Sequence, residues 1–159
     1  IMLMGSIAVQ GQQTTKFGHI DTNELLRMMP GREAATQEME RYTRELEAQY
    51  VAMQTEFQNK YQEYLEKQAT FSDLIRQARE RELQNLQERI VDFQEVAQQD
   101  LMEKERSLLS PIIEQARTAI TEVAKEHGFT YVFDTSTGTL LFWEAGENIM
   151  PMVRKKLGI

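Results

Sequence analysis

The sequence predicts a mainly α-helical protein with a small β part, an α+β fold built around a long antiparallel helical hairpin. Gly31 and Gly128 enclose a stretch that contains no other glycine and only one proline, Pro111. Because glycine and proline are the strongest local breakers of helices, their scarcity indicates long helices. Apolar residues in this stretch recur at steps of three and four, which gives each helix a single apolar stripe.

Composition limits the classes of function that the chain can serve. Its 159 residues suit one domain with a projecting element. Cysteine is absent, which excludes disulfides, thiolate metal sites and cysteine nucleophiles. The formal net charge is −7, whereas general nucleic-acid binding requires a basic surface. We therefore expect no nucleic-acid partner.

The chain begins with an apolar, uncharged run over residues 1–9, followed by a polar run over 10–15. This pattern resembles the end of a secretory signal, with Val9 and Gly11 as the small residues before a cleavage site. Residues 1–11 are thus predicted to be a signal-peptide remnant; a cloning remnant or a first strand are the alternatives. The run is shorter than the ~20 residues of a membrane span, so an exported, soluble protein is expected.

The next elements are short. Residues 16–21 alternate in polarity and predict a strand. Residues 22–29 then predict a short helix, because Pro30 and Gly31 follow directly.

The hairpin is predicted over residues 32–110, with its tip near 70–73. Thr70 or Ser72 can cap a second helix, and Asp73 would lie in the first turn of that helix, where the dipole favours a negative charge. A turn there leaves two arms of nearly equal length, as an antiparallel pair requires. A single unbroken helix and a dimeric coiled coil are the alternatives.

After Pro111 a helix with a broader apolar face is expected to resume and to end at Gly128. Residues 129–134 and 139–143 predict two strands joined by a turn, and residues 148–157 predict a terminal helix. Residues 16–31 and 111–159 would together form a small body. Three strands bury aromatic residues poorly, so we expect the body to form an oligomer. The residues predicted to build it are Ile20, Val132, Phe133, Leu140, Leu141 and Trp143.

Three segments, together with the order of the elements, carry a resemblance to a known family: 16–26 (KFGHIDTNELL), 124–134 (AKEHGFTYVFD) and 148–157 (NIMPMVRKKL). They resemble the Skp/OmpH family of periplasmic chaperones. The resemblance implies a homotrimer in which the strands form a shared body and three hairpins surround a cavity. It further implies an ATP-independent periplasmic holdase for unfolded outer-membrane proteins, which would meet the membrane only through its clients.

The arms depart from that family in charge. From Arg32 to Leu109 the chain carries 11 basic and 17 acidic residues, a net charge of −6. The well-studied relatives have basic arms, so no lipopolysaccharide-binding residues are carried over to this chain.

No motif predicts catalysis, a metal or a cofactor. Asp134 opens a Asp-Thr-Ser-Thr-Gly run that is similar to the aspartic-protease signature, but that chemistry needs a second carboxylate, and the sequence holds no second copy. His19 and His127 have no partner at metal-ligand spacing, and no glycine-rich phosphate loop is present.

The stripe of Met and aromatic residues near the hairpin tip has two interpretations. Most of these side chains would form the seam between the arms, whereas some would face clients, because thioethers and phenols adapt to varied partners. The predicted client-binding residues are Met53, Phe57, Tyr61, Tyr64, Phe71 and Leu74. The favoured hypothesis is a non-enzymatic holdase; a coiled-coil adaptor for one defined envelope partner and, less favoured, a hydrolase are the rivals.

Overall fold

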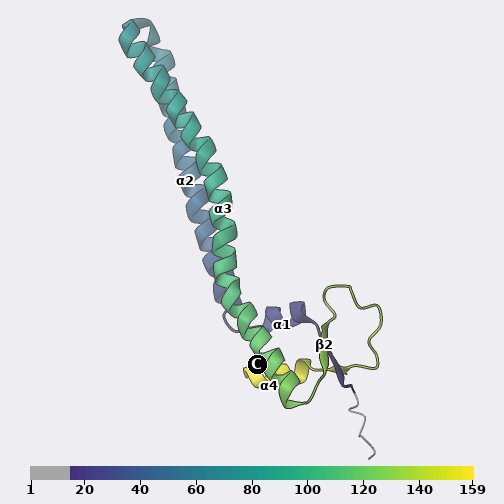
Figure 1. The fold of residues 1–159 in the computed structure, drawn as a ribbon. Coiled ribbons are helices and arrows are strands. Elements are labelled where there is room, and N and C mark those ends of the chain that lie inside the picture. The colour runs from purple at the N-terminus through teal and green to yellow at the C-terminus, as the bar shows by residue number, and fades with distance from the viewer. Residues whose placement is uncertain (1–14) are drawn as a thin grey trace, which may run out of the picture. The chain divides into compact units, whose positions relative to one another are not determined.

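The structure is a computed structural model that describes residues 15–159 (Figure 1). The predicted signal remnant, residues 1–11, lies outside the described residues. The chain divides into two compact units. Among the described residues, one unit consists of residues 15–29 and 113–159, and we call it the body; the other is Pro30–Ile112, the hairpin.

The body contains a three-stranded sheet in the order β2-β1-β3. The strands are β1 (Phe17–Ile20), β2 (Tyr131–Asp134) and β3 (Glu147–Asn148). Both outer strands pair in parallel with β1: Phe17 lies opposite Tyr131, and His19 lies opposite both Phe133 and Asn148. The first strand of the described residues, β1, is therefore the central strand of the sheet.

The third strand differs from the prediction. Residues 139–143, predicted to be a strand, form none in this structure, and Glu147–Asn148 pairs with β1 instead. The cause is strand direction. Since β2 and β3 both run parallel to β1, the chain must return to the starting end of the sheet between them, and a tight hairpin turn cannot do this. Residues 135–146 make that return.

Three helical segments complete the body: α1 (Thr22–Met28), the C-terminal part of α3 (Asp73–Glu126) and α4 (Met150–Leu157). Asp21 caps α1 by accepting a hydrogen bond from the backbone N–H of Glu24 at 2.8 Å. The terminal helix α4, predicted over residues 148–157, begins at Met150, two residues later than predicted. The apolar core of the body consists of Ile20, Leu25, Met29, Ala116, Ala119, Val123, Ile149, Met150 and Val153.

Gly18 permits close packing at the centre of the sheet. A Cβ placed there would lie 3.0 Å from the side chains of both Ile149 and Phe129, which is closer than ordinary van der Waals contact. A glycine at this point of β1 therefore lets the segments before α4 and β2 approach the strand.

The hairpin consists of α2 (Arg32–Lys67), a 3₁₀ turn over Gln68–Thr70 and the first part of α3. Figure 1 shows the two helices side by side along their length. Ser72 precedes α3, and its hydroxyl accepts a hydrogen bond from the backbone N–H of Ile75 at 3.4 Å. The predicted fold class, mainly α with a small β part and a long helical hairpin, is confirmed.

Pro111 does not interrupt α3, contrary to the expectation that a helix resumes after it. A proline within a helix removes one backbone hydrogen bond and usually bends the helix. Here its ring is exposed, and the flanking residues continue the helix on both sides.

Candidate functional site

Polar side chains connect the two arms of the hairpin along its length. The Lys104 ammonium lies 2.8 Å from the Glu38 carboxylate. The Tyr42 hydroxyl donates to Asp100, the amide of Gln94 donates to the Tyr50 hydroxyl at 2.9 Å, and the Tyr64 hydroxyl donates to Glu80 at 2.7 Å. As the residue number rises along α2 it falls along α3, which is the register of an antiparallel pair.

The ion pairs of the hairpin shift several pKa values. Hydrogen bonds from Arg41, and then from Lys104, lower the pKa of the Glu38 carboxyl to about 2. Nearer the tip, hydrogen bonds from Lys60 and Arg79 lower the pKa of Glu82. Both carboxylates are therefore charged at neutral pH, and each holds a cation from the opposite arm.

Apolar contacts fill the seam between these polar pairs. Met53 of α2 and Leu86 of α3 are buried, with 8% and 4% of their surface exposed. Phe57, Tyr64 and Phe71 are half-buried. The Tyr64 and Phe71 rings lie 6.2 Å apart, and the Phe57 ring stacks on Tyr61 at 6.0 Å.

The six residues predicted to bind clients therefore occupy different environments. Met53 is enclosed by the arms, and Phe57, Tyr64 and Phe71 each divide their surface between the seam and solvent. Tyr61 is 46% exposed and Leu74 is 78% exposed. Tyr61 and Leu74 thus offer the largest exposed surfaces of the six.

Sequence reasoning missed other exposed apolar side chains of the hairpin. Their positions lie off the main stripe of each helix, so the three-and-four spacing gave no signal for them. They are Val51, Leu65, Ile75, Val91, Val96 and Met102. Leu65, near the end of α2, and Ile75, near the start of α3, are exposed apolar side chains close to the tip, as are Tyr61 and Leu74.

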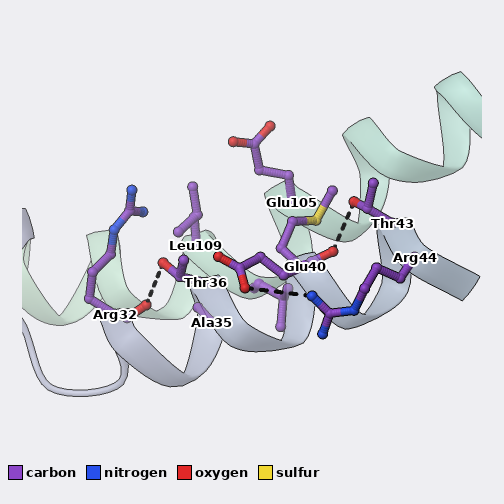
Figure 2. Close-up of a pocket in the computed structure, with 10 residues that line it drawn as sticks. Arg32, Ala35, Thr36, Glu40, Thr43, Arg44, Glu105 and Leu109 are labelled. Carbon is purple, nitrogen blue, oxygen red and sulfur yellow. Dashed lines mark hydrogen bonds and ion pairs between the residues drawn. The ribbon is translucent and has the colours of Figure 1, made fainter.

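Two pockets lie between the arms in the half of the hairpin away from its tip, and the second reaches the middle of the hairpin. The first has a volume of about 430 Å³, and its lining includes Ala35, Met39 and Leu109. Figure 2 shows Glu40 and Arg44 at its edge, where their charged groups lie 3.8 Å apart. The second has a volume of about 380 Å³ and includes Leu46, Phe93 and Leu101. The two pockets meet at Thr43, which lines both.

The body presents a second apolar surface. Alternation along the strands places Phe17, Tyr131 and Phe133 on one face of the sheet, where their ring centroids lie 6.0–6.2 Å apart. All three rings are at least 39% exposed. A pocket of about 250 Å³ adjoins them and is lined by Leu140, Phe142 and Trp143 among others.

The residues predicted to build an oligomer differ in how far they are buried. Ile20 is buried in the core of the body, and Val132 and Leu140 are half-buried. Phe133, Leu141 and Trp143 are exposed, and Leu141 has 94% of its surface open to solvent. Ile20 thus belongs to the core of the body, whereas Phe133, Leu141 and Trp143 are open to solvent.

Asp134 has a structural environment. Its carboxylate accepts hydrogen bonds from the Thr22 hydroxyl at 2.6 Å, from the Thr22 backbone N–H at 3.2 Å and from the Ser136 backbone N–H at 2.9 Å. Burial raises the pKa of this carboxyl, but the hydrogen bonds from Thr22 and Ser136 outweigh it and lower the pKa overall. Asp134 thus joins the end of β2 to the start of α1.

Comparisons with known proteins identify the family of this chain and a solved structure with a similar fold. A family model described as outer membrane protein (OmpH-like) matches residues 16–157. The chain belongs to the OmpH-like family. No curated protein matches the OmpH-like chain. Among solved structures it is similar to a Caulobacter crescentus CB15 protein named as an OmpH-like outer membrane chaperone, with a TM-score of 0.75 and 15% sequence identity. The match covers 99% of this chain and 90% of the Caulobacter chain, and at that identity it shows the fold alone.

Two further findings on the described residues of this OmpH-like chain concern membrane-spanning helices and groups that could bind a metal ion. No helix within residues 15–159 is long and apolar enough to cross a membrane. In the same part of the chain, no group of three or more His, Cys, Asp or Glu residues could hold a metal ion.

Proposed function

We propose that this OmpH-like protein is an ATP-independent holdase that binds unfolded outer-membrane proteins in the periplasm. The observation that carries the proposal is that apolar side chains of the hairpin are exposed to solvent and are not buried in the seam between the arms. Tyr61, Leu65, Leu74 and Ile75 are all at least 41% exposed around the tip. An unfolded chain offers apolar segments of many sequences, and several weak contacts with such segments add up through multivalency.

The geometry favours a binding protein over an enzyme. The pockets of the hairpin are lined largely by apolar and uncharged polar side chains, and two of the charged groups at the first pocket, Arg44 and Glu40, pair with one another. Asp134 is the residue on which the hydrolase hypothesis depends, and its carboxylate accepts hydrogen bonds from Thr22 and Ser136. The contacts that these residues make are structural.

We also propose that the body assembles into a homotrimer, as the family resemblance implies. The sheet has two edges, β2 and β3, and its aromatic face is open. An exposed sheet edge and an exposed apolar face are both stabilised by pairing with another copy. Leu141, Phe142 and Trp143 lie in the connection between β2 and β3, and pairing with a neighbouring copy would bury them.

The test of the holdase proposal is the suppression of aggregation. A urea-unfolded outer-membrane barrel protein is diluted into buffer with the wild-type protein or with a Tyr61→Ser, Leu65→Ser, Leu74→Ser, Ile75→Ser variant, and light scattering is followed. We expect the wild type to suppress scattering and the variant to lose most of this activity. These residues are exposed, so the fold should be kept, which circular dichroism checks.

Two controls sharpen this test. A variant with Arg76→Ser, Gln77→Ser, Arg81→Ser and Asn85→Ser also changes four exposed positions, all of them polar residues of α3, and removes no apolar side chain. It should suppress scattering as the wild type does. A panel of several unfolded clients and one folded envelope protein separates holdase from adaptor, since an adaptor would bind the folded partner alone. Absence of suppression by the wild-type protein would overturn the proposal.

A further inference from the structure

The middle of the hairpin combines acidic charge with exposed apolar surface. We define the middle segment as residues 45–59 of α2 and 90–103 of α3, which face one another through the Tyr50–Gln94 hydrogen bond. In Figure 1 it lies along the α2–α3 pair, between the tip and the opposite end of the hairpin. We propose that the middle segment binds client segments in which Lys or Arg residues are interspersed with apolar residues. The identification of the occupant as a client rests on the proposed function.

The apolar part of this surface is a pocket with apolar neighbours. Leu46, Phe93 and Leu101 line the pocket of about 380 Å³ between the arms. Val51 follows the pocket residue Glu47 by four positions, and Met102 follows the pocket residue Gln98 by four. Because residues four apart share a helix face, both side chains lie beside the pocket. Val51 is 57% exposed and Met102 is 59% exposed.

Val91 enlarges the same surface. It precedes the pocket residue Gln94 by three positions, so it lies on the same side of α3, and it is 58% exposed. The pocket thus continues into a strip of apolar surface on both helices.

Charge decides which occupant fits. The middle segment contains no Lys, Arg or His. Its seven carboxylates are Glu45, Glu47, Glu56, Asp92, Glu95, Asp100 and Glu103. Within residues 15–159, Glu45 pairs with Arg41 and Asp100 accepts from Tyr42, whereas the other five take part in no ion pair. Three cations that flank the segment, Arg44, Lys60 and Lys104, are paired with Glu40, Glu82 and Glu38. Glu47 lines the pocket and Glu95 follows its lining residue Gln94, so both carboxylates lie within a Debye length of the pocket.

This charge argues against a second copy as the occupant. The arms carry a net charge of −6, so two hairpins would repel one another at this surface. A polypeptide segment with cationic and apolar residues satisfies both features at once. It places Lys or Arg among the carboxylates and apolar side chains in the pocket. Acidic clients, by contrast, would be disfavoured here.

Two labelled, unstructured peptides test the inference. One consists of Lys, Leu and Gly residues, and its twin has Glu in place of each Lys. Fluorescence anisotropy measures their binding to the full-length wild-type protein at low salt. Each exposed charge pair contributes little, but several together should favour the Lys peptide by about tenfold or more. The preference should shrink as salt screens the charges. Equal binding of the two peptides would overturn the inference.

Matched variants locate the site. The variant Glu47→Gln, Asp92→Asn, Glu95→Gln, Glu103→Gln should bind the Lys peptide about tenfold more weakly. The control Glu33→Gln, Glu66→Gln, Glu114→Gln, Glu144→Gln removes the same charge outside the middle segment and should change the affinity less than about twofold. Equal losses in the two variants would show a general effect of net charge and would contradict the proposed site.

A third variant tests the apolar component. Val51→Ser, Val91→Ser, Met102→Ser should weaken the Lys peptide at unchanged charge, and unchanged affinity would exclude the pocket surface. The outcomes also separate this inference from the proposed function. A wild-type protein that suppresses client aggregation but does not distinguish the peptides overturns the inference alone. Failure to suppress aggregation of any client overturns the holdase function, whereas the peptide titration still decides whether the middle segment binds cationic segments.

Discussion

Glu38 of α2 and Lys104 of α3 form an ion pair of 2.8 Å between the two arms of the hairpin. Arg41, one turn along α2 from Glu38, donates to the same carboxylate. Two cations thus share one acid at this point of the seam, and they account for the lowered pKa of Glu38.

This cluster predicts a pH dependence of stability. The pKa of Glu38 falls from its ordinary value of 4.5 to about 2 in the folded chain, so its contribution to stability is present above pH 4.5. It is lost as the pH falls from 4.5 to about 2. We expect the melting temperatures of the wild type and a Glu38→Gln variant to differ at pH 7 and to converge towards pH 2. A gap that stays constant over this range would contradict the assignment.

The buried centre of the hairpin predicts a large effect of a small substitution. Met53 is 8% exposed between the arms, so Met53→Ala should lower the free energy of unfolding by roughly 2–4 kcal/mol through lost burial and a cavity. Val51→Ala, two residues away and 57% exposed, should change it by less than about 0.5 kcal/mol. Urea denaturation followed by circular dichroism measures both. Similar losses in the two variants would mean that Met53 is not enclosed by the seam.

The hydrogen bonds of Asp134 predict that this residue contributes to the free energy of unfolding. Asp134→Ala removes the acceptor of hydrogen bonds from Thr22 and Ser136, and should lower the free energy of unfolding by about 1–3 kcal/mol. Since the pKa of Asp134 is lowered, this difference should be largest above its ordinary value of 3.8 and should diminish at lower pH. Urea titrations at several pH values check it. An unchanged free energy of unfolding would show that the network does not hold β2 to α1.

The aromatic face of the sheet predicts the assembly state. Phe17→Ser, Tyr131→Ser should shift the protein from the proposed trimer to a monomer, because the exposed rings then no longer provide apolar surface for another copy. Native mass spectrometry measures the distribution of states. Tyr61→Ser on the hairpin is the control, and it should leave the trimer intact. A trimer that survives the change to the sheet would place the interface elsewhere.

The fold was predictable where local chemistry determines it. Long helices follow from the absence of glycine between Gly31 and Gly128, and the turn follows from the capping residues near Ser72. The strand expected at 139–143 shows the limit of local propensity. Its apolar and aromatic residues favour a strand, but the parallel pairing of β2 and β3 with β1 uses this segment as the connection. Glu147 and Asn148 pair with β1 although their side chains give no strand signal.

The candidate site was predictable only in part. The apolar stripe identified the residues near the seam, but the spacing does not show how far the partner helix covers each one. Met53 is therefore enclosed, whereas Leu74 in the same predicted set is 78% exposed. Val51 and Met102 lie off the stripe and become recognisable only when the pocket beside them is known. The role of Asp134 could not be predicted either, because its hydrogen-bond partner Thr22 is distant in sequence.

The claim that clients bind to the exposed apolar residues of the hairpin can be tested by site-specific photo-crosslinking. A photoreactive amino acid is placed at Leu74, at Val51 or, as a control, at Arg154, which is exposed on α4 of the body. The protein is then irradiated with an unfolded outer-membrane barrel protein. The account predicts crosslinks to the client from positions 74 and 51 and few from position 154. Crosslinks from position 154 alone would contradict it.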